Sequence, residues 1–171
     1  MKKVLLKKEA PFFNAESVFK LVSSVGLCFA VAAVGSLFTL PAPGSWYAAL
    51  AKPAFSPPNS VFGPVWTVLY LLIGIALFLV WRKEVQHPGE VRVAALFFVF
   101  QMALNLSWSI VFFGLQSVFG GLAVIVLLWT AILATTALFM RISRKAAWLM
   151  VPYIAWVTFA MILNYAIWAL N

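Results

Sequence analysis

The chain has 171 residues, of which 65% are hydrophobic and only 9% charged, and its mean hydropathy is +1.04. A domain that folds in water needs far more charge to solvate its surface, so this composition excludes a soluble protein and indicates an integral membrane protein. The net charge of +8 comes from twelve lysines and arginines against four acidic residues, and its meaning depends on where those charges lie.

Five apolar runs are each long enough to cross the hydrocarbon core of a bilayer as a helix, which takes about 20 residues. The runs cover residues 18–40, 61–81, 93–115, 118–140 and 146–170. We therefore expect an all-α fold, an integral membrane bundle of five transmembrane helices in which residues 1–171 form a single domain. The first run is too long for the apolar core of a signal peptide, so we expect the N-terminal segment to be retained.

The basic residues fall almost entirely on one side of this arrangement. Five precede or enter the first run, three lie between the second and third runs and three between the fourth and fifth, which leaves only Lys52 on the opposite side. The positive-inside rule then places the N-terminus on the inner face and the C-terminus on the outer face. The positive charge thus mainly sets topology, with attraction to anionic lipid as a second effect, and we do not expect nucleic acid as a partner.

The interiors of the runs contain no Asp, Glu, Arg or His, and Lys20 lies at an end from which its ammonium can reach the interface. Coupled transporters normally hold an ionisable residue within the membrane, so the sequence argues against a proton-coupled or ion-coupled pump and against a small multidrug exporter. It also offers no catalytic triad and no carboxylate pair in the membrane. Cys28 and His87 are the only residues of their kinds, so we expect neither a metal site nor a cofactor.

The loop between the first two runs holds the segment WYAALAKPAFSPPNSVFGPVW, which begins at Trp46. Pro53, Pro57 and Pro58 deny this loop a continuous helix, whereas WYAAL can form a short turn with its aromatic rings at interface depth. A loop of this length, stiffened by proline and placed opposite the basic face, can fold over the open end of the bundle as a lid. Trp46, Pro53 and Phe55 are its candidate ligand contacts.

Neutral polar and aromatic residues recur on one face of three of the runs. They are Trp66 and Tyr70 in the second run, Gln101, Asn105 and Trp108 in the third, and Tyr153, Trp156, Ala160 and Asn164 in the fifth, with Leu163 and Ile167 about one position round. Amides that join helices, and aromatic rings that pack or lie at the interface, explain any one of these residues. Together they favour a pocket for a flat apolar ligand with few polar atoms.

Three segments of the chain carry a signature in common. WYAALAKPAFSPPNSVFGPVW is followed, in order and at matching intervals, by QMALNLSWSIVFFG and PYIAWVTFAMILNY. These segments, which span roughly residues 46–168, resemble the translocator protein family, which includes the tryptophan-rich sensory proteins of bacteria and the peripheral benzodiazepine receptor of mitochondria. The resemblance implies five helices around a pocket that is closed by the first loop and accepts porphyrins, sterols and synthetic benzodiazepine-site drugs. It also implies a homodimer.

The resemblance assigns roles to particular residues. Trp66 and Trp156 match two pocket tryptophans that the family associates with light-dependent porphyrin breakdown. The pocket residues of the third helix are matched by Asn105 and Trp108, and the wall from the fifth helix by Ala160 and Leu163. The prolines of the lid are matched by Pro53, Pro57 and Pro58. This chain has Phe55 where many members have a tryptophan. It also lacks the basic residue that should follow Tyr165 in the family's sterol motif, so we expect weak cholesterol binding.

We therefore expect a bacterial-type membrane receptor that binds porphyrins, such as protoporphyrin IX or heme-type tetrapyrroles, and that senses or transports them. Two alternatives stay open: a light- and oxygen-dependent activity that degrades the bound porphyrin with the two pocket tryptophans, and a lipid- or sterol-binding scaffold without catalysis. The expected location is a bacterial cell membrane, inner or outer. Small residues four positions apart, Gly26 with Ala30 and Ala103 with Ser107, would let two copies pack closely as a homodimer.

The charge distribution predicts which loops face which compartment. In a Cys28→Ser background, single cysteines at Glu84 and Ser143 should react with a membrane-impermeant maleimide only from the inner side, because positively charged loops remain inside. Cysteines at Lys52 and Asn171 should react only from the outer side. Labelling of intact and lysed cells measures this sidedness, and reaction of positions 84 and 171 from the same side would contradict the five-span arrangement.

Overall fold

The computed structural model describes residues 14–39 and 45–171, and within these residues every regular element is a helix. The elements are α1 (Ala15–Thr39), α2 (Trp46–Ala49), α3 (Asn59–Trp81), α4 (Pro88–Ser109), the π-helical turn η1 (Ile110–Gly114), α5 (Val118–Ile142) and α6 (Arg144–Leu170). In this part of the chain five helices, with η1 counted as the end of α4, are long and apolar enough to cross a membrane. The predicted all-α bundle of five transmembrane helices is therefore confirmed.

Local signals in the sequence set where the helices begin. Asn14 accepts a hydrogen bond from the Ser17 N–H at 2.7 Å and so caps α1, and the hydroxyls of Ser117 and Ser143 accept from N–H groups in the first turns of α5 and α6. The helix α4 begins with Pro88. The first N–H groups of a helix have no acceptor within it, so the missing N–H of proline costs nothing at this position. Each of these residues thereby removes or satisfies a backbone donor that would otherwise be bare near the membrane interface.

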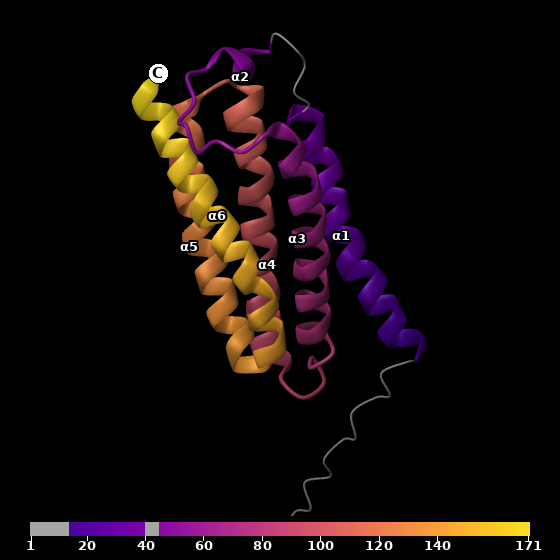
Figure 1. Ribbon diagram of the computed structural model, residues 1–171. Helices are drawn as coiled ribbons and strands as arrows, with labels where there is room; N and C mark the ends of the chain where they lie inside the picture. The colour runs from indigo at the N-terminus through magenta and orange to yellow at the C-terminus, as the bar shows by residue number, and fades with distance from the viewer. Residues whose placement is uncertain (1–13, 40–44) are drawn as a thin grey trace, which may run out of the picture.

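The five long helices form a closed ring in the order α1, α3, α6, α5, α4 and back to α1. Figure 1 shows them side by side, with α2 and the residues that lead from it to α3 lying across one end of the bundle, close to the C-terminus. Helices α4, α5 and α6 pack next to their neighbours in sequence, whereas α3 packs between α1 and α6 and has only slight contact with α4. All five helices contribute buried side chains to the interior of the ring.

Two glycines allow neighbouring elements to approach closely. A Cβ on Gly74 in α3 would lie 2.8 Å from the backbone Cα of Val25 in α1, and a Cβ on Gly121 in α5 would lie 2.6 Å from the Phe112 ring in η1. Atoms do not pack at such distances, so only glycine permits the observed spacing. The seam between α1 and α3 is thereby fixed at a point partway along both helices.

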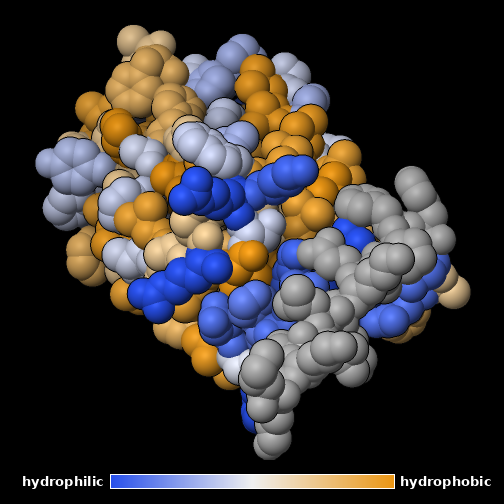
Figure 2. Space-filling model, turned by 90° about the horizontal axis from the view of Figure 1, so that it is seen from below, coloured by the Kyte–Doolittle hydropathy of each residue, from blue (hydrophilic) through white to orange (hydrophobic). Residues whose placement is uncertain are grey.

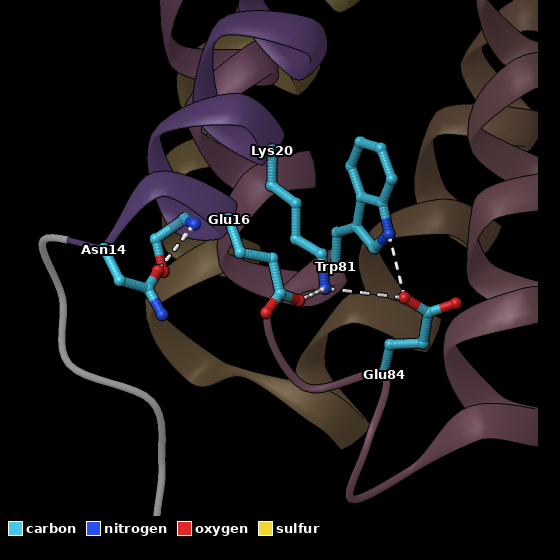
Figure 3. A network of polar contacts seen from close by, with 6 residues as sticks. Asn14, Glu16, Lys20, Trp81 and Glu84 are labelled. Atoms are coloured by element: carbon cyan, nitrogen blue, oxygen red, sulfur yellow. Dashed lines mark hydrogen bonds and ion pairs between the residues drawn. The ribbon is translucent and has the colours of Figure 1, made fainter.

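A salt-bridge cluster closes the α1–α3 seam at the end of the bundle opposite α2. The Lys20 ammonium lies 2.9 Å from a carboxylate oxygen of Glu16 and 3.5 Å from one of Glu84. It also lies 5.7 Å from the centre of the Trp81 ring, whose Nε1 donates to the same Glu84 oxygen at 3.0 Å (Figure 3). Lys20 therefore stays at the edge of the apolar region with its charge compensated by two carboxylates.

Charged groups gather at this same end, which we call the inner end. Figure 2, a view onto it, shows hydrophilic residues over the ends of the helices. The described basic residues here are Lys20, Arg82, Lys83, Arg92, Arg141, Arg144 and Lys145, and Lys52 lies at the opposite, outer end beside α2. Four further basic residues, Lys2, Lys3, Lys7 and Lys8, and Leu40, the expected end of the first span, lie outside the described residues. This separation of charge is the one that the positive-inside rule requires.

Replacing Gly74 by alanine should destabilise the bundle, because the added Cβ would meet the Val25 backbone at 2.8 Å and push α1 away from α3. We expect a loss of roughly 1–3 kcal/mol, the usual range for overpacking, seen as a lower midpoint of thermal unfolding in detergent by circular dichroism. Gly63→Ala is the matched control in the same helix, since nothing lies within 4 Å of a Cβ built there. Equal midpoints for the two variants would show that α1 shifts without cost.

Candidate ligand-binding cavity

The bundle contains a cavity of about 470 Å³ at its outer end, beneath α2. The residues that line it come from α1, α2, α3, α4, η1 and α6. They are Phe29, Ala32, Gly35, Ser36, Thr39, Tyr47, Asn59, Phe62, Gly63, Trp66, Thr67, Tyr70, Asn105, Trp108, Ser109, Phe112, Phe113, Trp156, Ala160, Leu163, Asn164 and Ile167. A volume in this range is typical of sites for small-molecule ligands.

Trp66 and Trp156 form one aromatic wall of the cavity, from α3 and α6. The centre of the Trp66 ring lies 5.4 Å from that of Tyr70, at an interplanar angle of 30°, and 6.1 Å from that of Tyr153. The Trp156 ring packs edge-on against Phe62 at 5.8 Å. These ring contacts hold both indoles in place at the border of the cavity.

A second aromatic wall comes from the end of α4 and from η1. The rings of Trp108 and Phe112 stack with their centres 5.3 Å apart, and the Phe113 ring lies 5.7 Å from Trp108. In η1 the Leu115 N–H donates to the Ile110 carbonyl, five residues back, at 2.8 Å. This wider turn lets two phenylalanines that are adjacent in sequence both border the cavity.

Four polar side chains form a hydrogen-bond chain behind the aromatic walls. The Tyr70 hydroxyl donates to Asn105 Oδ1 at 2.6 Å, and Asn105 Nδ2 donates to Tyr153 Oη at 3.0 Å. The Tyr153 hydroxyl in turn donates to Gln101 Oε1 at 3.2 Å. Tyr70 and Asn105 border the cavity, whereas Tyr153 and Gln101 are fully buried behind them. The chain joins α3, α4 and α6 and pairs polar groups that would be costly to leave unpaired in a membrane.

Asn164 sets the orientation of Trp108. Trp108 Nε1 donates to Asn164 Oδ1 at 3.2 Å, and Asn164 Nδ2 donates to the Val118 carbonyl at 3.1 Å, so one amide ties α4, α5 and α6 together. Trp156 differs, because its buried Nε1 has no hydrogen-bond partner among the described residues. A buried, unmatched donor in a cavity wall is a candidate hydrogen-bonding group for a ligand.

The lining of the cavity is uncharged. Among its described residues none is Asp, Glu, Lys, Arg or His. Over residues 14–39 and 45–171 there is likewise no group of three or more His, Cys, Asp or Glu side chains that could hold a metal ion. The cavity offers aromatic faces and neutral hydrogen-bonding groups, so it suits a flat apolar molecule better than an ion.

Residues 45–58, between α1 and α3, lie over the outer end of the cavity. Tyr47 in α2 borders the cavity and packs against the rings of Phe112 and Phe113, with centres 6.1 and 5.4 Å away. Burial raises the pKa of the Tyr47 phenol above its ordinary value. The Lys52 ammonium lies 4.6 Å from the centre of the Tyr47 ring, which adds a cation–π contact within this segment.

The end of α6 holds the same segment, residues 45–58, which we call the lid. The Ala51 N–H donates to Asn171 Oδ1 at 3.0 Å, and Asn171 Nδ2 donates to the Ala51 carbonyl at 3.1 Å. The same nitrogen donates to the Ile167 carbonyl at 2.7 Å, which anchors the amide to its own helix. The lid is thus joined both to the aromatic wall and to the end of α6.

Eight of the twelve residues predicted to contact a ligand border the cavity. They are Trp66, Tyr70, Asn105, Trp108, Trp156, Ala160, Leu163 and Asn164. The other four, which lie outside its lining, are Trp46, Pro53, Phe55 and Gln101. Trp46 packs on the Phe112 ring at 5.7 Å, and the half-exposed Phe55 packs on Phe159 at 6.4 Å. Gln101 lies behind Tyr153 rather than on the cavity surface.

The helix α1 provides a wall that sequence reasoning did not identify. Phe29, Ala32, Gly35, Ser36 and Thr39 border the cavity from this helix. One phenylalanine and several small residues in an apolar span follow no pattern that separates a cavity wall from ordinary helix packing. The phenylalanine pair of η1 was missed for a different reason, because a π-helical turn shifts residues off the 3.6-residue period.

The amino-acid sequence matches the TspO/MBR family over residues 24–169, a range that includes every residue lining the cavity. It is similar to the tryptophan-rich protein TspO of Chlorobaculum tepidum, with 45% identity over 161 residues that cover 91% of this chain and 98% of that protein. It is also similar to the protein CrtK of Rhodobacter capsulatus, with 39% identity over 144 residues that cover 84% and 88%. The human translocator protein is 38% identical over 153 residues, which cover 90% of this chain and 88% of that protein.

Removing the Asn171 amide should loosen the lid, because the Ala51 N–H would lose its acceptor. In Asn171→Leu we expect amide hydrogen exchange at Ala51 to become roughly tenfold faster, the effect of about one hydrogen bond, measured by mass spectrometry on peptides from the lid. Asn171→Asp keeps an acceptor for the Ala51 N–H but sets a second oxygen against the Ala51 and Ile167 carbonyls, so its exchange rate should lie between those of wild type and Asn171→Leu. Equal exchange in all three proteins would mean that the ring contacts of Tyr47 alone hold the lid.

Proposed function

The chain belongs to the TspO/MBR family, and from that premise we propose that it binds porphyrins, such as protoporphyrin IX, and other flat hydrophobic molecules in its outer cavity. The family includes translocator proteins and tryptophan-rich sensory proteins, and the five apolar helices make this chain a multi-pass membrane protein. The observation that carries the proposal is a cavity of about 470 Å³ with two aromatic walls and an uncharged lining among the described residues.

The aromatic walls supply most of the binding free energy in this proposal. Trp66 and Trp156 border the cavity from α3 and α6, and Trp108 and Phe112 border it from α4 and η1. A flat macrocycle between them would have aromatic surface on both of its faces, and each buried aromatic side chain covers about 150–250 Å². Burial of apolar surface is favourable roughly in proportion to area. A porphyrin fits because its two faces are apolar and its charged groups lie on its edge.

The distribution of charge favours one orientation of the ligand. The two carboxylates of protoporphyrin IX would have to give up their hydration in the uncharged interior, without an ionic partner in return. At the outer end they would stay close to water and to Lys52, the one basic residue at that end among those described. We therefore place the carboxylates toward the lid, with the rest of the ring deeper in the cavity above Tyr70 and Asn105.

A second function, light-driven degradation of the bound porphyrin, is favoured by the placement of two tryptophans. Trp66 and Trp156 both border the cavity, so an excited porphyrin would lie against two indoles, which give up an electron more readily than phenyl rings. Dioxygen would serve as the oxidant. A lipid- or sterol-binding scaffold without catalysis has no such supporting observation, and the absence of a basic residue after Tyr165 argues for weak sterol binding.

We also propose that two copies associate through small residues on the lipid-facing surface. Gly26, Ala30 and Ala103 are exposed there, and nothing lies within 4 Å of a Cβ built on Gly26. Small residues let helices of two chains approach closely, which is how helices associate in lipid without a hydrophobic driving force.

In this proposal, ligand binding is the first step of sensing or transport. These activities are the ones named in a tryptophan-rich sensory protein of Cereibacter sphaeroides and in the translocator proteins.

Binding and degradation should separate in a tryptophan double variant. Trp66→Phe with Trp156→Phe should bind protoporphyrin IX within about tenfold of wild type, or roughly 1.4 kcal/mol, because phenyl rings still stack on the ligand. It should lose most of the light-driven breakdown, because phenyl is much harder to oxidise than indole. A fluorescence titration in the dark measures binding, and absorbance under light in air measures breakdown.

The matched control is Trp148→Phe with Trp168→Phe. It removes the same number of indoles from the surface that faces away from the interior of the bundle, where these residues are 68% and 43% exposed. It should behave as wild type in both measurements. An absence of saturable porphyrin binding to wild type would overturn the proposed function. Undiminished breakdown in the cavity variant would show that Trp66 and Trp156 are packing residues, and binding without any breakdown would rule out the degrading activity.

A further inference from the structure

The hydrogen-bond chain behind the cavity has a direction. The Tyr70 proton is donated to Asn105, and the chain continues through Tyr153 to Gln101. A hydroxyl has one proton, so in this arrangement Tyr70 can only accept a further hydrogen bond from an occupant of the cavity. At Tyr70 the cavity therefore prefers a ligand that presents an N–H or O–H.

The far end of the chain carries a group that makes this direction reversible. Gln101 is 0% exposed, and its Nε2 has no hydrogen-bond partner among the described residues. The last torsion of a glutamine side chain is broad and roughly two-fold, so a half-turn exchanges the positions of its amide nitrogen and oxygen. After that half-turn Gln101 donates to Tyr153 instead of accepting from it.

Reversal keeps the number of internal hydrogen bonds constant. Once Gln101 donates to Tyr153, the Tyr153 hydroxyl is free to donate to Asn105. Asn105, after its own half-turn, donates to Tyr70, so three hydrogen bonds still join the four side chains. Only the ends differ: the unpaired group on Gln101 becomes a carbonyl, which proteins leave unpaired more readily than an N–H, and the Tyr70 proton becomes available to the cavity.

We propose that this chain sets the hydrogen-bond polarity of the cavity, so that Tyr70 accepts from ligands that present an N–H and donates to ligands that present a carbonyl. The inference rests on the proposed function, because it concerns the same site. Gln101 is a positioning residue in this scheme, since it does not touch the ligand and acts through Tyr153 and Asn105.

The uncharged lining gives the reversal its effect on selectivity. An unmatched donor or acceptor on a buried ligand costs much more than a matched one contributes, and no charged residue among those lining the cavity can compensate for it. At the position of Tyr70, a chain fixed in one direction would therefore discriminate against one of the two ligand classes, and the unpaired Trp156 Nε1, which can only donate, cannot replace an acceptor there. A reversible chain accepts both, because only amide and hydroxyl rotations separate its two states.

Three flat tricyclic molecules of nearly the same shape distinguish the two polarities. Carbazole presents an N–H, fluorenone presents a carbonyl at the same ring position, and fluorene presents neither. Isothermal titration calorimetry of the full chain in lipid nanodiscs, with empty nanodiscs as the blank, gives the three dissociation constants. Wild type should bind carbazole and fluorenone each at least about threefold more tightly than fluorene, the gain expected from one hydrogen bond.

Gln101→Met should fix the chain in one direction. Methionine is of similar length but cannot donate and accepts only weakly, so the Tyr153 proton goes to Asn105 and Tyr70 donates to the ligand. The advantage of fluorenone over fluorene should persist, whereas that of carbazole should fall to less than about twofold. Gln101→Glu should restore the carbazole advantage, because its carboxyl oxygen again accepts from Tyr153.

Thr135→Val is the matched control, because Thr135 is also buried and polar but donates only to the Ala131 carbonyl of its own helix. Both advantages should survive in it. Each result is a ratio to fluorene, so a loosened fold that weakens all three ligands alike leaves the ratios unchanged.

The inference is overturned if, in Gln101→Met, the carbazole and fluorenone advantages survive or fall together. Failure of Gln101→Glu to restore carbazole binding overturns it as well. If wild type binds protoporphyrin IX but none of the three tricyclic probes, the inference fails alone. If it binds none of the four molecules, the proposed function fails with it.

Discussion

The two hydrogen bonds of the Asn105 side chain are the interactions on which the rest of the bundle depends. Asn105 lies on α4, accepts from Tyr70 of α3 and donates to Tyr153 of α6, so one buried side chain fixes the relative positions of three long helices. Within a membrane, apolar side chains gain little by exchanging lipid for protein, and interhelical hydrogen bonds and close packing hold helices together instead. Tyr70 and Asn105 also border the cavity. The hydrogen bond between them therefore both joins α3 to α4 and forms part of the wall of the ligand site.

The two ends of the bundle are held by different means. Toward the inner end α1 stays against α3 through backbone contact at Gly74 and through the charge cluster around Lys20. At the outer end aromatic rings take the place of close backbone contact. Rigid rings such as those of Trp66 and Trp108, each fixed by neighbouring rings or by a hydrogen bond, cannot collapse into the space between them. The same helices therefore pack tightly at one end and enclose a cavity at the other.

Much of the fold and part of the site could be predicted from the sequence. The length of the apolar runs predicts five spans, and the i, i+3 spacing of Asn105 and Trp108 predicts that both border the cavity, as they do. The same periodicity placed Gln101 there too, but Gln101 lies one turn deeper and is covered by Tyr153. Spacing gives the direction of a side chain around the helix axis and not the depth at which a cavity ends. The position of Phe113 depends on a π-helical turn, which no 3.6-residue pattern contains.

The Asn171 amide connects the lid to a helix that is longer than the hydrocarbon core of a membrane is thick. The helix α6 has 27 residues, which corresponds to about 40 Å, against a hydrocarbon core of about 30 Å. Such a helix tilts to match the bilayer, and it tilts further when the bilayer is thinner. Because the Ala51 backbone is bonded to the residue that follows α6, a change of tilt moves the point to which the lid is tied. We therefore expect the thickness of the bilayer to affect where the lid lies over the cavity.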